Sequence, residues 1–87
     1  MEAIMAPEDV ERKLRGRPFT PFRMFLSDGA VYEVNHPELV LLGRRSLVLG
    51  LTGDPQAIHY DRAVDIDLLH IVRMENVEPR SVQGNGG

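Results

Sequence analysis

Residues 22–51, FRMFLSDGAVYEVNHPELVLLGRRSLVLGL, predict two consecutive hairpins around which the rest of the fold is built. The first turn falls at Asp28-Gly29 and the second at residues 43–46. Asp-Gly between alternating apolar residues is a strong hairpin signal, because both residue types tolerate the backbone conformations of tight turns.

The register of the first hairpin follows from which side chains must share a face. A two-residue loop would pair Met24 with Glu33 and mix polar and apolar side chains on both faces. A three-residue loop at residues 27–29 places the apolar side chains on one face of the hairpin. The register matters because a slip of one residue would move every side chain to the other face. We therefore predict that loop, with Gly29 in the left-handed conformation as a bulge. The pairs are then Phe22 with Val34, Met24 with Tyr32 and Leu26 with Ala30, and on the other face Arg23 with Glu33 and Phe25 with Val31.

A short helix is predicted at residues 7–15, because Pro7 suits a first helical position and Gly16 supplies a stop. Strands are predicted at residues 22–27, 30–35, 39–42, 47–51, 57–67 and 71–76, with a tight turn at 67–70. The expected fold class is mainly β: an N-terminal short α-helix plus a small, strongly bent antiparallel sheet or an Sm/SH3-like β-barrel of five or six strands. We expect one domain at residues 1–78 and a flexible tail at 79–87.

Residues 57–67 alternate between apolar and polar side chains. This pattern predicts a strand with one face inward and one face in water. The inward set is Ile58, Tyr60, Val64 and Ile66, and the outward set is His59, Asp61, Asp65 and Asp67. Arg62 interrupts the inner face.

Composition narrows the classes of function. The chain has 87 residues, a formal net charge of −3 and no cysteine. Without cysteine it forms no disulfide and no thiolate zinc site. Its net negative charge disfavours strong electrostatic binding to a phosphate backbone.

The acidic N-terminus does not resemble a signal peptide, and the apolar run at residues 39–51 is too short to span a bilayer. We expect a cytoplasmic protein.

The strands predicted at 39–42 and 47–51 are apolar on both faces. Such strands are usually covered on two sides, and a chain this small buries little more than roughly 60% of its unfolded surface. We therefore expect a second copy to supply the other cover, which makes the protein a homo-oligomer. The expected self-association residues are Leu39, Leu41, Leu47, Leu49 and Leu51.

Basic residues concentrate at one predicted hairpin tip. Arg44 and Arg45 there, together with His70, are candidates for contact with a nucleic acid or another anion. The alternative is that the two arginines only keep the turn soluble.

No catalytic, cofactor or metal motif is recognisable in the chain. The three histidines lack metal-ligand spacing, and no nucleophile-with-base arrangement or glycine-rich phosphate loop occurs. Asp61, Asp65 and Asp67 share the expected outer face of one strand, where a solvated acidic surface is the common case. We expect no enzymatic activity, no cofactor and no metal.

The segments PFTPFRMFLSDG, VNHPELVLLGRRS and DLLHIVRMEN resemble a widespread family of small uncharacterised bacterial proteins. The resemblance covers residues 14–76, and HPE followed by GRRS is its most specific part. That family has no established activity, so the resemblance implies no catalytic residues.

A second, weaker resemblance is to Sm-like barrels, including the bacterial RNA-chaperone type. LSDGAVYEV looks like their first hairpin, and DLLHIVRME looks like their last turn and strand. The resemblance implies that His70 lies near the RNA-facing position. The chain departs from the pattern at Asp67, which stands where a basic residue is usual.

Three hypotheses follow. The first is a non-enzymatic, self-associating small β-barrel that acts as a binding or scaffolding module, with another protein as a further partner. The second is an Sm-like RNA-binding protein. The third is a small enzyme that uses the aspartates of residues 61–67 with His59 or His70.

Overall fold

The computed structural model describes residues 5–54, 56–57 and 59–77. Within them the chain forms one helix, six strands and two short 3-10 helices, so the structure is mainly β as expected. The elements are α1 (Pro7–Leu14), β1 (Phe22–Leu26), β2 (Val31–Val34), η1 (Pro37–Leu39), β3 (Val40–Leu42), β4 (Ser46–Leu51), β5 (Arg62–Asp67), η2 (Leu68–His70) and β6 (Ile71–Asn76).

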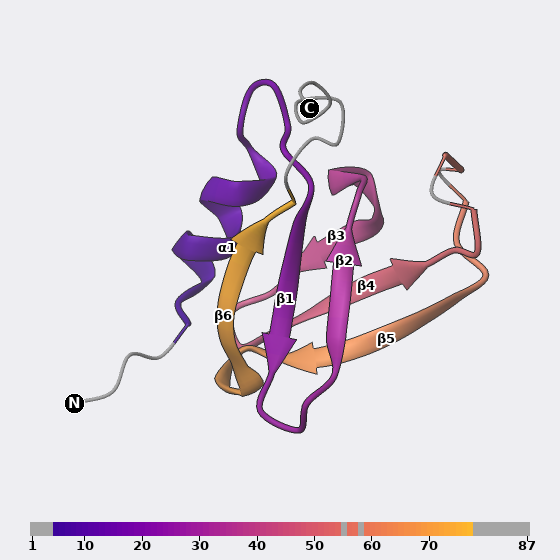
Figure 1. Ribbon diagram of the computed structural model, residues 1–87. Helices are drawn as coiled ribbons and strands as arrows, with labels where there is room; N and C mark the ends of the chain where they lie inside the picture. The colour runs from indigo at the N-terminus through magenta and orange to yellow at the C-terminus, as the bar shows by residue number, and fades with distance from the viewer. Residues whose placement is uncertain (1–4, 55, 58, 78–87) are drawn as a thin grey trace, which may run out of the picture.

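The strands form two antiparallel sheets of three, in the orders β2-β1-β6 and β3-β4-β5. Figure 1 shows β2, β1 and β6 upright in front of the other three strands, with α1 beside β6. No ladder joins the two sheets among the described residues, so they do not close into one barrel.

The first hairpin has the predicted register. Phe22 is opposite Val34, Arg23 opposite Glu33, Met24 opposite Tyr32 and Phe25 opposite Val31. The backbone N–H of Leu26 donates to the carbonyl of Ala30 at 2.9 Å, which closes the three-residue loop. Gly29 has a φ of 93°, a left-handed conformation that glycine adopts without steric cost.

The core lies between the sheets and under α1. Phe22 and Met24 from the first sheet are fully buried, as are Leu47 and Leu49 from the second. Val10 is the residue of α1 that joins them, at 0% exposure. The helix is also held to β6, because the Lys13 ammonium donates to the Asn76 side chain at 2.7 Å.

Within the chain, β3 and β4 are covered on one side, and the expected cover of their other side by a second copy stays a prediction. Their side chains alternate: Val40, Leu47 and Leu49 point inward and are buried, whereas Leu41 is 71% exposed. Leu47 and Leu49, expected at an interface, are each 1% exposed within the chain's own core. α1 and the opposite sheet therefore cover the inner side, which holds Leu47 and Leu49, and leave the outer side at Leu41 open within the chain.

The other expected interface leucines are also placed differently. Leu39 belongs to η1 rather than to a strand, because the chain turns at the corner that His36-Pro37 begins. Leu39 and Leu51 are half-buried, and Leu51 packs against the core.

The predicted strand at residues 57–67 begins later, at Arg62. Tyr60, expected inside, is 61% exposed, while Val64 and Ile66 do face inward. The loop before β5 is held by its own polar contacts: Asp61 donates its backbone N–H to the carbonyl of Leu51 at 2.7 Å, and its carboxylate accepts from the Gly53 N–H at 3.1 Å. Ile58 lies outside the described residues, as does the expected tail at 79–87.

Candidate functional site

A groove runs between α1 and the tip of the β3–β4 hairpin. It consists of two adjoining cavities of about 530 and 500 Å³, which share Pro7 and Arg44. We call it the α1–tip groove. The first cavity is lined by Pro7, Glu8, Glu11, Leu14, Arg15, Leu42, Gly43 and Arg44, and the second by Met5, Ala6, Pro7, Arg44, Arg45, Asp67, Leu68 and Leu69.

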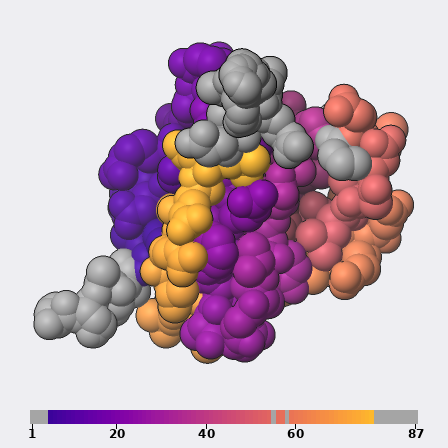
Figure 2. Space-filling model, viewed as in Figure 1, coloured from indigo at the N-terminus to yellow at the C-terminus, as the bar shows by residue number. Residues whose placement is uncertain are grey.

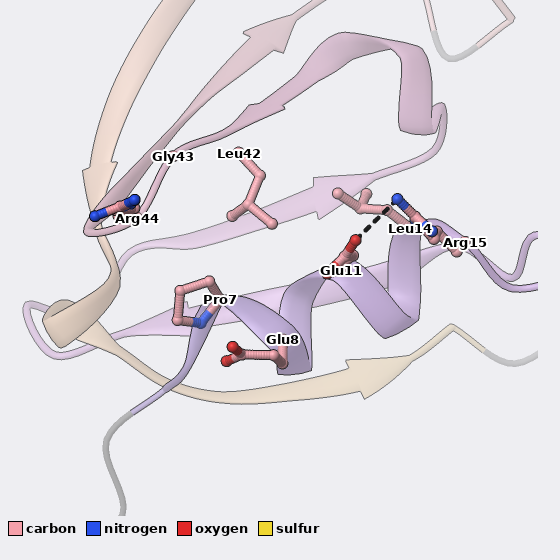
Figure 3. Close-up of a pocket in the computed structure, with 8 residues that line it drawn as sticks. All are labelled: Pro7, Glu8, Glu11, Leu14, Arg15, Leu42, Gly43 and Arg44. Carbon is pink, nitrogen blue, oxygen red and sulfur yellow. Dashed lines mark ion pairs between the residues drawn. The ribbon is translucent and has the colours of Figure 1, made fainter.

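Figure 3 shows the first cavity, with Leu42 reaching from β3 toward α1 and Glu11 joined to Arg15. That ion pair measures 2.9 Å. Leu14 and Leu42 are both half-buried against the core, so they give this part of the groove an apolar floor.

Backbone hydrogen bonds fix the second cavity by joining the hairpin tip to η2. Gly43 donates its N–H to the Ser46 carbonyl at 2.8 Å, which leaves Arg44 and Arg45 at the turn. The Leu68 N–H donates to the Arg45 carbonyl at 2.8 Å. The Asp67 carboxylate caps η2 by accepting from the Leu69 N–H at 3.0 Å. Two segments that are distant in the sequence therefore meet in one place.

The charges of the groove are unevenly distributed. Arg44 and Arg45 are exposed, and neither forms an ion pair with any residue that the structure describes. Other arginines do: Arg12 with Asp9, Arg15 with Glu11, Arg23 with Glu33 and Arg73 with Glu75. The tip therefore offers two guanidinium groups that are uncommitted within the described chain.

His70 lies in a different cavity from Arg44 and Arg45. It lines a hollow of about 280 Å³ with Ser27, Asp28, Asp65 and Asp67 among its neighbours. Its Nδ1 lies 3.2 Å from the Ser27 hydroxyl, and its carbonyl accepts from the Ser27 N–H at 2.8 Å. The structure thus brings the two arginines together and places His70 in a separate hollow, with Asp67 lining both cavities.

Only some of the aspartates that the enzyme hypothesis invokes lie close to one another. Asp65 and Asp67 share the hollow of His70, whereas Asp61 is held in the loop before β5. All of these side chains are exposed, so no apolar enclosure separates them from water. Throughout the described part of the chain, no group of three or more histidines and carboxylates stands close enough to hold a metal ion.

The outer face of the β3-β4-β5 sheet carries a second candidate surface. Leu41, Val48 and Asp65 are neighbours in one row across the three strands. Leu41 is 71% exposed and Val48 is half-buried. We call Leu41 and Val48 the outer leucine patch.

The outer face of the other sheet, built of β6, β1 and β2, is toward the viewer in Figure 2. Its central ring, Phe25, is covered by Arg73, whose guanidinium carbon lies 3.8 Å from the ring centre. Alternating charges flank the pair, with Arg23 opposite both Glu33 and Glu75. The Arg73 guanidinium therefore occupies one face of this ring.

The groove's apolar side was missed by reasoning from the sequence. Leu68 and Leu69 follow the last inward residue of β5, and a single 3-10 turn cannot bury both side chains. Leu68 is buried, and Leu69 is 65% exposed at the groove. The adjacent leucines of this turn were the available signal.

Comparison of the chain with family models, with curated proteins and with solved structures finds no match. The two resemblances noted from the sequence therefore remain predictions. No helix within the described residues is long and apolar enough to cross a membrane.

Proposed function

We propose that this protein is a non-enzymatic binding and scaffolding module that self-associates through the outer leucine patch. One observation carries the proposal: Leu41 is 71% exposed in the row that also contains Val48. A leucine side chain moved from water into an apolar contact contributes about 1.5–3 kcal/mol. An isologous dimer gains this contribution twice, because the same patch serves both copies.

The proposed interface is smaller than the sequence suggested. Leu47 and Leu49 belong to the chain's own core, so Leu41 is the expected interface residue that remains largely available to a partner. β3 is an edge strand of its sheet, which makes the patch accessible from the side as well as from above.

Sedimentation velocity over a range of protein concentrations tests the proposal. The unaltered chain should show a dimer that dissociates on dilution, and Leu41→Asp should remain a monomer throughout. Val72→Asp is the matched control, because Val72 is 58% exposed on β6 in the other sheet. A monomer at all concentrations, or equal loss of the dimer in both variants, would refute self-association through this patch.

The alternative function is an Sm-like RNA-binding protein. It is favoured by the two uncommitted guanidinium groups of Arg44 and Arg45, since phosphate contacts in proteins come largely from arginine and lysine. The net charge of −3 and the nearby carboxylate of Asp67 weigh against it. Filter binding of short single-stranded RNA at increasing salt tests it, because contacts with phosphate must weaken as salt rises.

A further inference from the structure

We propose that the α1–tip groove binds a short segment of a protein partner in which an acidic side chain stands next to a large aliphatic one. This inference rests on the binding function proposed above and names the class of ligand that the module binds. The occupant follows from the shape, the apolar lining and the charge of the groove.

The groove is large enough for a peptide segment. Each of its two cavities, at about 530 and 500 Å³, lies within the range of roughly 300–1,000 Å³ that ligand pockets occupy. The cavities adjoin at Pro7 and Arg44, so an extended segment can lie across both.

The apolar lining selects an aliphatic side chain. Leu69 is 65% exposed at the second cavity, and half-buried Met5 and Pro7 also line it. A ligand that covers Leu69 removes an exposed leucine from water, which is a favourable contribution to binding. The first cavity continues this lining through Leu14 and Leu42.

The charges of the groove favour an acidic residue next to the aliphatic residue of the ligand, and they set the orientation of the bound segment. Arg44 and Arg45 share the second cavity with one carboxylate, that of Asp67, which already accepts from the Leu69 N–H. In the first cavity Glu11 is paired with Arg15, and Glu8 has no ion pair within the described chain. The acidic side chain of the ligand therefore belongs at the hairpin tip, and the rest of the segment runs toward Glu8.

A peptide fits these features better than RNA does. The apolar residues Met5, Pro7 and Leu69 offer nothing to a phosphate backbone. Glu8 and Asp67 repel a chain that is charged at every nucleotide more than a segment that carries a single carboxylate. A carboxylate beside an aliphatic side chain engages both the guanidinium groups and the lining, and arginine suits a carboxylate because it can bind both oxygens at once.

The test starts from a phage library of random twelve-residue peptides selected on the immobilised full chain. Selected peptides are then labelled with fluorescein and measured by fluorescence polarisation. We expect the sequences to share an acidic residue beside Leu, Ile or Phe. We expect affinity to fall at least tenfold in the double variant Arg44→Glu/Arg45→Glu and in Leu69→Asp.

Matched controls keep the result interpretable. Arg62→Glu removes an exposed arginine that lines neither cavity, and Val72→Asp places a charge on an exposed valine elsewhere, so both should leave affinity within twofold. Circular dichroism confirms that each variant is folded. If the glutamate pair disturbs folding, Arg44→Gln/Arg45→Gln replaces it.

Several outcomes would overturn the proposal: no peptide selected above background, selected peptides without an acidic residue, or equal binding by the double variant. A single-stranded RNA oligomer that binds where peptides do not would favour the RNA function. Loss of the dimer in the double variant would assign the groove to a second copy. Leu41→Asp should still bind the peptides, so failure of self-association and failure of this site are distinguishable.

Discussion

Gly50 is a residue of β4 at which the structure leaves no room for a side chain. A Cβ atom placed there would lie 2.8 Å from the Cβ of Tyr60 and 3.1 Å from its ring. The loop before β5 therefore packs directly on the backbone of the strand. Tyr60 is 61% exposed because it covers this glycine instead of entering the core.

Gly50→Ala should lower the free energy of unfolding by about 1–3 kcal/mol, the usual cost of forcing extra volume into a packed site. The obstructing atom is a Cβ close to the backbone, so the loop itself has to move. Urea unfolding followed by circular dichroism measures the change. Gly53→Ala is the control, because its nearest neighbour lies 3.9 Å away. Equal stability of Gly50→Ala and the unaltered chain would contradict close packing of Tyr60.

Residue-level prediction succeeded where the chemistry is local. Asp28 and Gly29 specify their loop through their own backbone preferences, and the Asp28 carboxylate accepts from the Ala30 N–H at 2.9 Å. Tyr60 was placed wrongly because alternation continues through residues 57–61, whereas hydrogen bonds of the preceding loop decide where the strand begins.

At the scale of elements, α1 depends on its docking. Eight residues are too few for a stable isolated helix, so its packing must hold it. Val10 is fully buried, and half-buried Leu14 lies one turn further along the same side. The helix is therefore both a cover for the core and one wall of the α1–tip groove.

Val10→Ala should lower the free energy of unfolding by about 1–3 kcal/mol, since it removes two buried methyl groups and leaves a cavity. Arg12→Ala, at a side chain that is 75% exposed, should change it by less than about 0.5 kcal/mol. Thermal and urea unfolding measure both variants. A Val10→Ala chain as stable as the control would mean that α1 is not docked through this residue.

The sequence predicted most elements but not how they cover one another. The helix, the first hairpin and the strand at 71–76 could be derived, because their periodicity and turn residues are local signals. Periodicity cannot say what lies over an apolar face, so Leu47 and Leu49, which the chain's own core covers, were expected at an interface with a second copy. Likewise, Arg44-Arg45 and the turn at 67–70 were predicted separately, and their contact required the tertiary structure.

At the scale of the whole molecule, self-association predicts a stability that depends on concentration. Assembly of folded chains stabilises them by mass action, so dilution should lower the unfolding temperature. We expect the midpoint of the unaltered chain to rise over a hundredfold increase in concentration, while that of Leu41→Asp stays constant. Differential scanning fluorimetry at several concentrations measures this. A midpoint independent of concentration in both proteins would contradict dimer formation.

The pairing of β1 with β6 has a consequence for folding during synthesis. Phe22 lies opposite Asn76, so the first sheet joins the first and the last strand of the described chain. Contacts this distant along the chain are slow to form, because a long loop must close first. On the ribosome, β1 and β2 emerge as a lone hairpin, a structure that is marginal in water. Until residues 71–76 leave the exit tunnel, one flank of β1 is open to chaperones and to neighbouring nascent chains.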